Sequence, residues 1–259
     1  MIEIKNVNFH YSGLDQAGLS DFNLSVTDGE CILLCGASGC GKTTVTRLIN
    51  GLIPHFFKGE LTGDVYVNGL DIKQQELYNL AGIVGSVFQN PRSQFFSVDT
   101  DGEVVFGPEN IGLPKPEILS RKKQVVQELN LNYLLGRSLF DLSGGEKQKI
   151  VIARAVAQTT PWMLLDEPIA SLDIKNQIEI MQTLSELNRQ EGVSVLMVLH
   201  DINLAGIYCD RLIMLKDGQV IAAGNTNECL CEENLKKLYD ISFFHMDTKK
   251  GQRYYYAEI

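Results

Sequence analysis

A glycine-rich segment, residues 36–43, ends in a lysine and a threonine and follows a short apolar run at residues 31–35. Its sequence fits the pattern GxxxxGK[ST]. Glycines let backbone N–H groups curl around phosphate oxygens, and the start of a following helix adds positive potential. Lys42 is expected to reach the β- and γ-phosphates of a nucleotide, and Thr43 to hold Mg²⁺. The candidate nucleotide-binding residues are Gly36, Ala37, Ser38, Gly39, Cys40, Gly41, Lys42, Thr43 and Thr44.

Two adjacent carboxylates, Asp166 and Glu167, end a second apolar run. At the carboxyl edge of an open α/β sheet, where ligands collect, such a pair suits a metal ion and a water molecule. Asp166 is expected to bind Mg²⁺, and Glu167 to accept or orient the proton of the water that attacks the γ-phosphate. Alone, the pair could be a helix N-cap. Together with the glycine-rich loop, it predicts hydrolysis of ATP.

A third segment, residues 142–148, begins a helix with small residues and exposed N–H groups, which makes a second potential anion site. Read alone, it is an ordinary helix N-cap. At these separations from the loop and the carboxylates, it resembles the signature motif of ABC ATPases. We call Ser143, Gly144, Gly145 and Glu146 the signature segment. The resemblance covers nearly the whole chain.

The resemblance implies roles for four further residues that fall in the family's order. Tyr11 would stack on adenine, Gln89 would sense Mg²⁺ and the attacking water, His200 would contact the γ-phosphate, and Asp173 would couple two sites. Singly, each has a plainer interpretation, such as a surface aromatic or a core histidine. The implied catalytic residues are Glu167, His200, Lys42 and Gln89, and the implied Mg²⁺ ligands are Thr43, Gln89 and Asp166.

The same resemblance implies a head-to-tail dimer with a second ABC ATPase, identical or paralogous. The signature segment of one chain would close over ATP held by Lys42 of the other, so that a lone chain hydrolyses ATP poorly.

Departures from the family pattern are few. Residues 170–173 read Ala-Ser-Leu-Asp where Ser-Ala is the commoner order, Lys149 stands where arginine is frequent, and Cys40 puts a thiol inside the loop.

Residues 50–55, 59–63, 88–96 and 105–114 resemble the ATPases of energy-coupling factor importers. Such importers take up vitamins, cobalt or nickel through a transmembrane coupling protein and a substrate-binding membrane protein. Residues 199–205 and 232–239 instead resemble ATPases of iron-siderophore and cobalamin importers. The first interpretation is preferred because the Gln89 region is expected to receive the membrane partner. Phe95 and Phe96 could serve that surface or the core, and a non-transport ABC ATPase is a third alternative.

With 44% hydrophobic and 21% charged residues, the chain of 259 residues can bury a large core and is expected to form one globular domain, or one domain with a subdomain. The net charge of −9 argues against nucleic acid as a partner. The start lacks the features of a secretion signal, and apolar runs such as 193–199 are far below the ~18 residues of a spanning helix. We therefore expect a place inside the cell, and the resemblance implies a peripheral position on the cytoplasmic face of the cell membrane, through a membrane partner. The six cysteines are expected to be free and mostly buried.

The elements that must position these residues can be predicted from periodicity and turn residues. Strands are predicted at 2–9, 19–26, 31–35, 82–88, 162–165, 193–199, 211–216 and 219–223. Helices are predicted at 42–52, 103–110, 114–135, 144–157, 174–190 and 203–208, with one more beyond residue 225. The fold class is α/β: by resemblance, a phosphate-loop NTPase core of ABC ATPase type with an antiparallel β portion. A helical subdomain at about 73–138 is expected within a single domain, 1–259.

Overall fold

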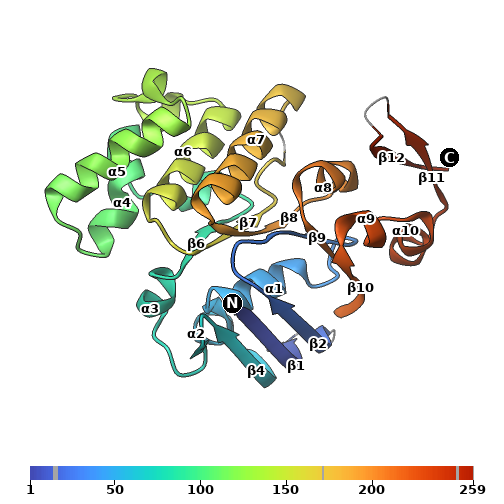
Figure 1. The fold of residues 1–259 in the computed structure, drawn as a ribbon. Coiled ribbons are helices and arrows are strands. Elements are labelled where there is room, and N and C mark those ends of the chain that lie inside the picture. Colours follow the sequence, from blue (N-terminus) through green and yellow to red (C-terminus); the bar gives the residue numbers. More distant parts are fainter. Residues whose placement is uncertain (14–16, 171, 249–250, 259) are drawn as a thin grey trace.

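A six-stranded sheet forms the centre of the computed structural model, which describes residues 1–13, 17–170, 172–248 and 251–258 (Figure 1). The strand order is β10-β9-β3-β8-β7-β6, and every neighbouring pair is parallel except β10 with β9. The strands are β3 (Cys31–Cys35), β6 (Val84–Val87), β7 (Trp162–Asp166), β8 (Ser194–Val198), β9 (Arg211–Lys216) and β10 (Gln219–Asn225). This sheet confirms the predicted α/β class.

A second, antiparallel sheet has the order β2-β1-β4-β5. Its strands are β1 (Ile2–Tyr11), β2 (Ala17–Val26), β4 (Gly59–Val67) and β5 (Leu70–Asp71). The first two were predicted, but β4 was not. Gly63 interrupts the apolar alternation of β4, at a point where the register between β4 and β1 shifts. A Cβ on Gly63 would lie 2.4 Å from the carbonyl oxygen of Asn6, so the interrupting glycine is needed for the close approach of the strands.

Helices cover both faces of the central sheet. On one face lie α4, α5, α6 and α7, and α1 lies on the other, between the two sheets (Figure 1). The helices up to α6 are α1 (Lys42–Ile49), α2 (Leu52–His55), α3 (Leu77–Ala81), α4 (Thr100–Asn110), α5 (Lys115–Glu128) and α6 (Gly144–Ala157). Those that follow are α7 (Ile174–Glu191), α8 (Ile202–Tyr208), α9 (Thr226–Cys229) and α10 (Glu232–Tyr239). Short 3₁₀ turns are η1 (Pro91–Gln94), η2 (Asn132–Leu134) and η3 (Leu139–Asp141).

The range 73–138 contains the helical layer from η1 to η2 together with β6, which is an edge strand of the central sheet. Within that range, α5 ends at Glu128 and a separate turn follows, where one helix over 114–135 was predicted. Asn130 has a φ of +53°, a left-handed conformation that stops the helix.

Each face of the central sheet packs against its own hydrophobic core. In β3, Leu33 belongs to the core beneath α4–α7, whereas Ile32 and Leu34 belong to the core shared with α1 and the antiparallel sheet. Successive residues of a strand point to opposite faces, so a fully buried strand serves both cores. Because β3 and β7 are parallel and belong to one sheet, the residues that follow them, Gly36 and Glu167, emerge at the same edge.

The C-terminal region differs from the prediction of one helix. It holds two helices, α9 and α10, and a hairpin of β11 (Phe243–Asp247) and β12 (Arg253–Ala257). Cys231 adopts an extended conformation between the two helices, which explains why a single helix was wrong. All six cysteines are free, and five of them are buried, as predicted. Among the described residues, no helix has both the length and the apolar character needed to cross a membrane.

Candidate functional site

The glycine-rich loop after β3 wraps around the ammonium group of Lys42. Lys42 Nζ donates hydrogen bonds to the carbonyl oxygens of Gly36 (2.9 Å) and Ala37 (2.8 Å), and the residue is only 6% exposed. A Cβ on Gly36 would lie 2.1 Å from the carbonyl oxygen of Leu215, and Gly41 has a φ of +108°. Glycine is therefore required at both positions. The loop holds a cation at the N-terminus of α1, an arrangement suited to an anionic ligand.

Tyr11, at the end of β1, lies beside the first turn of α1. Its hydroxyl shares a hydrogen bond with Thr44 Oγ1 (3.1 Å) and accepts one from Arg47 Nη1 (3.0 Å). The ring packs edge-on against Phe9 and Phe57, with centroid separations of 4.7 and 6.3 Å. The antiparallel sheet thus places a partly exposed aromatic ring next to the start of α1.

Glu167 is the point at which three predicted catalytic side chains meet. Gln89 Nε2 donates to Glu167 Oε2 (2.7 Å), and His200 Nε2 lies 2.8 Å from Glu167 Oε1. Gln89 follows β6, Glu167 follows β7, and His200 follows β8. Three neighbouring parallel strands therefore bring these side chains to one place. Glu167 has a φ of +53°, and its N–H donates to the carbonyl of Val198. A left-handed non-glycine residue stores strain, and such residues cluster at functional sites.

Asp166 has the features of a metal ligand. It is 5% exposed, and its Oδ1 has no hydrogen-bond partner in the described structure. Burial raises the pKa of this carboxyl, and the neighbouring Glu167 charge raises it further, whereas a hydrogen bond from the Thr43 side chain lowers it. An unpartnered carboxylate oxygen beside a hydroxyl offers the hard oxygen ligands that Mg²⁺ prefers. Residues Asp166 and Thr43 therefore fit the predicted cation.

The signature segment starts α6 with a complete capping box. Ser143 Oγ accepts from the N–H of Glu146, and Glu146 Oε2 accepts from the N–H of Ser143. The hydrogen bonds from Ser143 lower the pKa of the Glu146 carboxyl, which also pairs with Arg137 at 2.9 Å. Gly144 faces open space, since a Cβ there would meet no atom within 4 Å. The segment is thus rigid, and its outer surface is open.

Asp173 belongs with the signature segment rather than with the loop. It is the N-cap of α7, where it accepts from the N–H of Asn176 at 2.9 Å, and this bond lowers the pKa of its carboxyl. A Cβ on Gly145 would lie 3.1 Å from the Asn176 side chain, so the starts of α6 and α7 are in contact. Ser171, part of the predicted departure at 170–173, lies outside the described residues.

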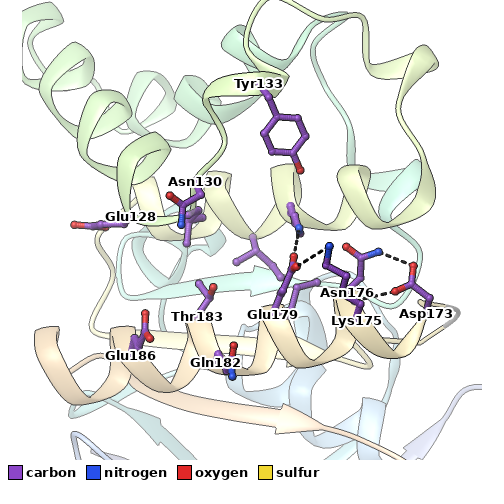
Figure 2. A pocket seen from close by; sticks show the side chains of 14 residues that line it. Glu128, Asn130, Tyr133, Asp173, Lys175, Asn176, Glu179, Gln182, Thr183 and Glu186 are labelled. Carbon is purple, nitrogen blue, oxygen red and sulfur yellow. Dashed lines mark hydrogen bonds and ion pairs between the residues drawn. The ribbon is translucent and has the colours of Figure 1, made fainter.

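A polar groove of about 620 Å³ lies between α6 and α7 and extends along α7 from Asp173 to Glu186 (Figure 2). Lys149 Nζ, from α6, donates to Glu179 Oε2, from α7, at 2.6 Å. The lysine found where arginine is frequent in the family therefore has a carboxylate partner, and it ties the two helices together.

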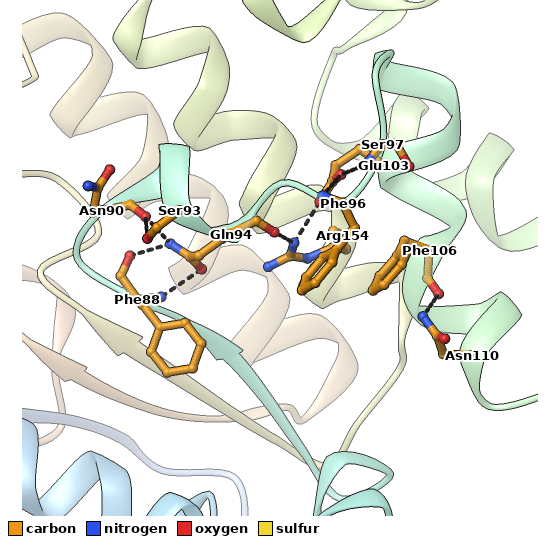
Figure 3. A network of polar contacts seen from close by, with 10 residues as sticks. All are labelled: Phe88, Asn90, Ser93, Gln94, Phe96, Ser97, Glu103, Phe106, Asn110 and Arg154. Carbon is orange, nitrogen blue, oxygen red and sulfur yellow. Dashed lines mark hydrogen bonds and ion pairs between the residues drawn. The ribbon is translucent and has the colours of Figure 1, made fainter. Parts of the chain in front are cut away.

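Sequence reasoning missed a buried ion pair that fixes the segment after Gln89 (Figure 3). Arg154 Nη1, on α6, lies 2.6 Å from Glu103 Oε1, on α4, and also donates to the carbonyl of Gln94. Glu103 Oε2 accepts from the N–H groups of Phe96 and Ser97, both at 3.0 Å. The available signal was a charged residue on the apolar face of each helix, since buried charges require partners.

Phe95 and Phe96, which the sequence could not assign to the core or to an exposed surface, have different environments in the structure. Phe95 packs against the core, whereas Phe96 is 68% exposed. The Phe96 ring stacks on Phe106 with centroids 4.3 Å apart and planes 2° from parallel. Gln94 ties the adjoining backbone by accepting from the N–H of Phe88 and donating to its carbonyl. The exposed ring is therefore held in a fixed position.

The family model described as "ABC transporter" matches residues 19–170 of the chain. An ABC transporter ATP-binding protein of Treponema denticola is 44% identical over 220 residues, which are 85% of this chain and 45% of that protein. The chain thus spans less than half the length of this relative. Another ABC transporter ATP-binding protein, of Pyrococcus abyssi, is 35% identical and is covered over 81% of its length, with 88% of this chain aligned.

Three solved structures have the same fold. CbiO1 of Clostridium perfringens, part of the ABC transporter complex CbiONQ, is 29% identical with a TM-score of 0.80 and covers 91% of this chain and 92% of its own. The ATP-binding cassette MJ0796, a dimer bound to ADP and Pi, is 30% identical with a TM-score of 0.76, covering 87% and 99%. A metal-chelate type ABC transporter in an inward-facing conformation is 25% identical with a TM-score of 0.81, covering 100% and 97%.

Proposed function

Because the chain belongs to the ABC transporter family as an ATP-binding subunit, we propose that it hydrolyses ATP at the loop and carboxylates described above, to drive import across a membrane. The observation that carries the proposal is the convergence of Gln89 and His200 on Glu167, one residue after Asp166 with its unpartnered oxygen. Water activation, γ-phosphate contact and cation binding thereby adjoin one another at the edge of the sheet.

The proposed roles follow from chemistry and position. The N–H groups of residues 36–44 and the Lys42 ammonium hold the phosphates, and Tyr11 receives the adenine ring. Glu167 takes the proton of the attacking water, and its contacts with Gln89 and His200 fix its orientation before the nucleotide arrives. Thr43, Asp166 and Gln89 would hold Mg²⁺. When bound, the cation neutralises charge that develops on the transferring phosphate.

We further propose that two chains form the complete catalytic site. The signature segment has a fixed backbone and an open outer surface at Gly144, which suits close approach to a partner's nucleotide. The N–H groups at the start of α6 would stabilise the charge on the γ-phosphate of ATP in the partner. Asp173, in contact with the same helix start through Asn176, would couple the two sites. The dimer of MJ0796 bound to ADP and Pi supports this assembly.

The proposed transporter is an importer of the energy-coupling factor type, for a vitamin or a transition-metal ion. The likeness to CbiO1, a component of CbiONQ, supports it, as do the sequence similarities at 88–96 and 105–114. The ATPase would sit on the cytoplasmic face of the membrane and bind a transmembrane coupling protein through the Gln89 region. In this proposal, residues 1–259 are one ABC ATPase domain, and the helical subdomain within 73–138 carries the contact surface.

An iron-siderophore or cobalamin importer is the second candidate. The metal-chelate type transporter covers all of this chain, including the C-terminal part whose sequence first suggested that alternative. The two candidates differ in the membrane proteins that they require, not in the chemistry of ATP hydrolysis.

The test is copurification of the tagged full chain from its native membranes in mild detergent, with mass spectrometry of stoichiometric partners. We expect a coupling protein and a small substrate-binding membrane protein. A paired permease would replace this proposal with the second candidate, and the absence of any membrane protein would contradict both. The Lys42→Ala variant is the matched control, because it should retain the same partners while losing hydrolysis of ATP.

A further inference from the structure

A single buried side chain, Gln94, holds the backbone on both sides of Gln89. Its Nε2 donates to the carbonyl oxygens of Phe88 (2.7 Å) and Asn90 (2.9 Å), and its Oε1 accepts from the N–H of Phe88 (2.9 Å) (Figure 3). A glutamine amide has two N–H donors, and both are used here on carbonyls that flank one residue. Gln94 is 4% exposed, so bulk water does not compete for these bonds. The side chain therefore fixes the backbone immediately before and after Gln89.

Gln89 depends on this support because neither the sheet nor burial holds it. The ladder between β6 and β7 ends at Val87, two residues earlier, and the Gln89 side chain is exposed. Its Nε2 nevertheless donates to Glu167 Oε2, at 2.7 Å. An exposed glutamine side chain can adopt several rotamers, so its reach to Glu167 depends on where its backbone starts. The Gln94 amide sets that starting point.

Gln94 is in turn held in place by residues of two helices. Its carbonyl oxygen accepts a hydrogen bond from Arg154 Nη1, on α6, and Arg154 pairs with Glu103, on α4, at 2.6 Å. Arg154 is 8% exposed, and Glu103 is fully buried. Glu103 also accepts from the N–H groups of Phe96 and Ser97, so the chain just after Gln94 is fixed as well. A side chain supported in this way can hold a neighbouring group in one position.

We propose that Gln94 is a positioning residue for ATP hydrolysis, which acts through Gln89 and not on the nucleotide itself. The inference rests on the proposed function, in which contact with Gln89 fixes the orientation of Glu167. By bonding to the backbone on either side of Gln89, the Gln94 amide keeps Gln89 Nε2 directed at Glu167. Preorganisation of this kind speeds the chemical step. Loss of the amide should therefore lower kcat, whereas the KM for ATP should stay nearly constant because residues 36–44 hold the phosphates.

The hydrogen bonds define which side chains could replace Gln94. Glutamate has the same length, but its carboxylate would set an oxygen against the carbonyls of Phe88 and Asn90, to which Gln94 now donates. Methionine has a similar length and neither donates nor accepts strongly. Both substitutions keep the volume of the side chain while removing its two donors.

The experiment measures steady-state ATP hydrolysis by the full chain in the complex with which it copurifies, for Gln94→Met, Gln89→Ala and the double variant. Gln94→Met should lower kcat about 10–10²-fold, because a small displacement of a catalytic group costs this much. The KM for ATP should change less than about twofold. The double variant should be no slower than Gln89→Ala, since no Gln89 side chain remains to be positioned.

The matched control is Gln124→Met. It removes an exposed amide of α5 that is bonded to Glu128 of the same helix, and it should hydrolyse ATP at the wild-type rate. Rates are divided by the number of sites that bind a fluorescent ATP analogue, so that a loss of folded protein is not counted as a loss of kcat. If Gln94→Met folds poorly, Gln94→Glu replaces it, because it keeps the acceptor for the Phe88 N–H, and the same fall in kcat is expected.

The double variant distinguishes a positioning role from a purely structural one. An unchanged kcat in the Gln94 variant, or losses that multiply when it is combined with Gln89→Ala, overturns the inference and leaves the proposed function in place. Full activity of Gln89→Ala alone overturns the inference together with the proposed role of Gln89.

Discussion

The glycine-rich loop with Glu167 and the signature segment are two half-sites that are built differently. The first half-site gathers residues that follow β6, β7 and β8, together with Lys42 at the start of α1. Gln89 and His200 already contact Glu167, and Lys42 is bound to the backbone of the loop. In the second half-site, the capping box of Ser143 and Glu146 supplies the hydrogen-bond partners of the helix start, and Gly144 presents an open surface. The comparison indicates that the first half-site is organised within the single chain, whereas the second leaves an open surface at Gly144 that a partner would have to cover.

The largest expected effect falls on the first half-site. Glu167→Gln should lower the rate of ATP hydrolysis by about 10²–10⁴-fold, because the amide cannot accept the proton of the attacking water. ATP binding should persist, since the loop is unchanged. Phosphate release and binding of a fluorescent ATP analogue measure the two quantities. Glu60→Gln, an exposed change on β4, is the control, and a loss of less than tenfold in Glu167→Gln would remove Glu167 from the proposed role.

The rigidity of the second half-site is tested by the ion pair that ties its helix to α4. Glu103→Ala should lower the free energy of unfolding by about 3–5 kcal/mol, because it leaves the buried charge of Arg154 without its carboxylate. Urea unfolding followed by fluorescence of Trp162, which is the single tryptophan and fully buried, gives this value.

Glu233→Gln removes a partner from the exposed pair with Lys237 and serves as the control, with no measurable loss of stability expected. Equal effects of the two substitutions would show that Arg154 and Glu103 do not hold α6 against α4.

The need for a partner is tested at Gly144. Gly144→Arg should leave the fold and ATP binding intact, because a Cβ there meets open space, yet lower hydrolysis by about 10²-fold by blocking approach to the other chain's nucleotide. Mixing this variant with Lys42→Ala should restore part of the activity, since one composite site then has an intact loop and an intact signature segment. Full activity of Gly144→Arg alone would mean that one chain suffices.

The two half-sites also differ in how far sequence could predict them. The strand at 31–35 and the start of the helix at Lys42 were predicted to the residue, because glycine spacing and apolar periodicity are local signals, although the helix ends at Ile49 rather than at 52. The hydrogen bonds of Gln89 and His200 to Glu167 depend on strand order, which no local pattern specifies. The missed strand β4 and the Glu103–Arg154 pair have the same cause, since each is defined by a distant partner. Sequence therefore proposed the site residues, but it could not predict the contacts that hold them.

Cys40 gives the smallest expected effect and probes whether the first half-site is closed before ATP binds. Burial raises the pKa of this thiol, and the nearby Lys42 charge only partly offsets it. Since the thiolate is the reactive form, alkylation should be slow at pH 7 and should still be accelerating above pH 9. ATP should slow it further by filling the loop, as mass spectrometry of the labelled peptide would show. Cys231, the one cysteine that is not fully buried, is the internal control, and equal labelling of Cys40 with and without ATP would place the nucleotide elsewhere.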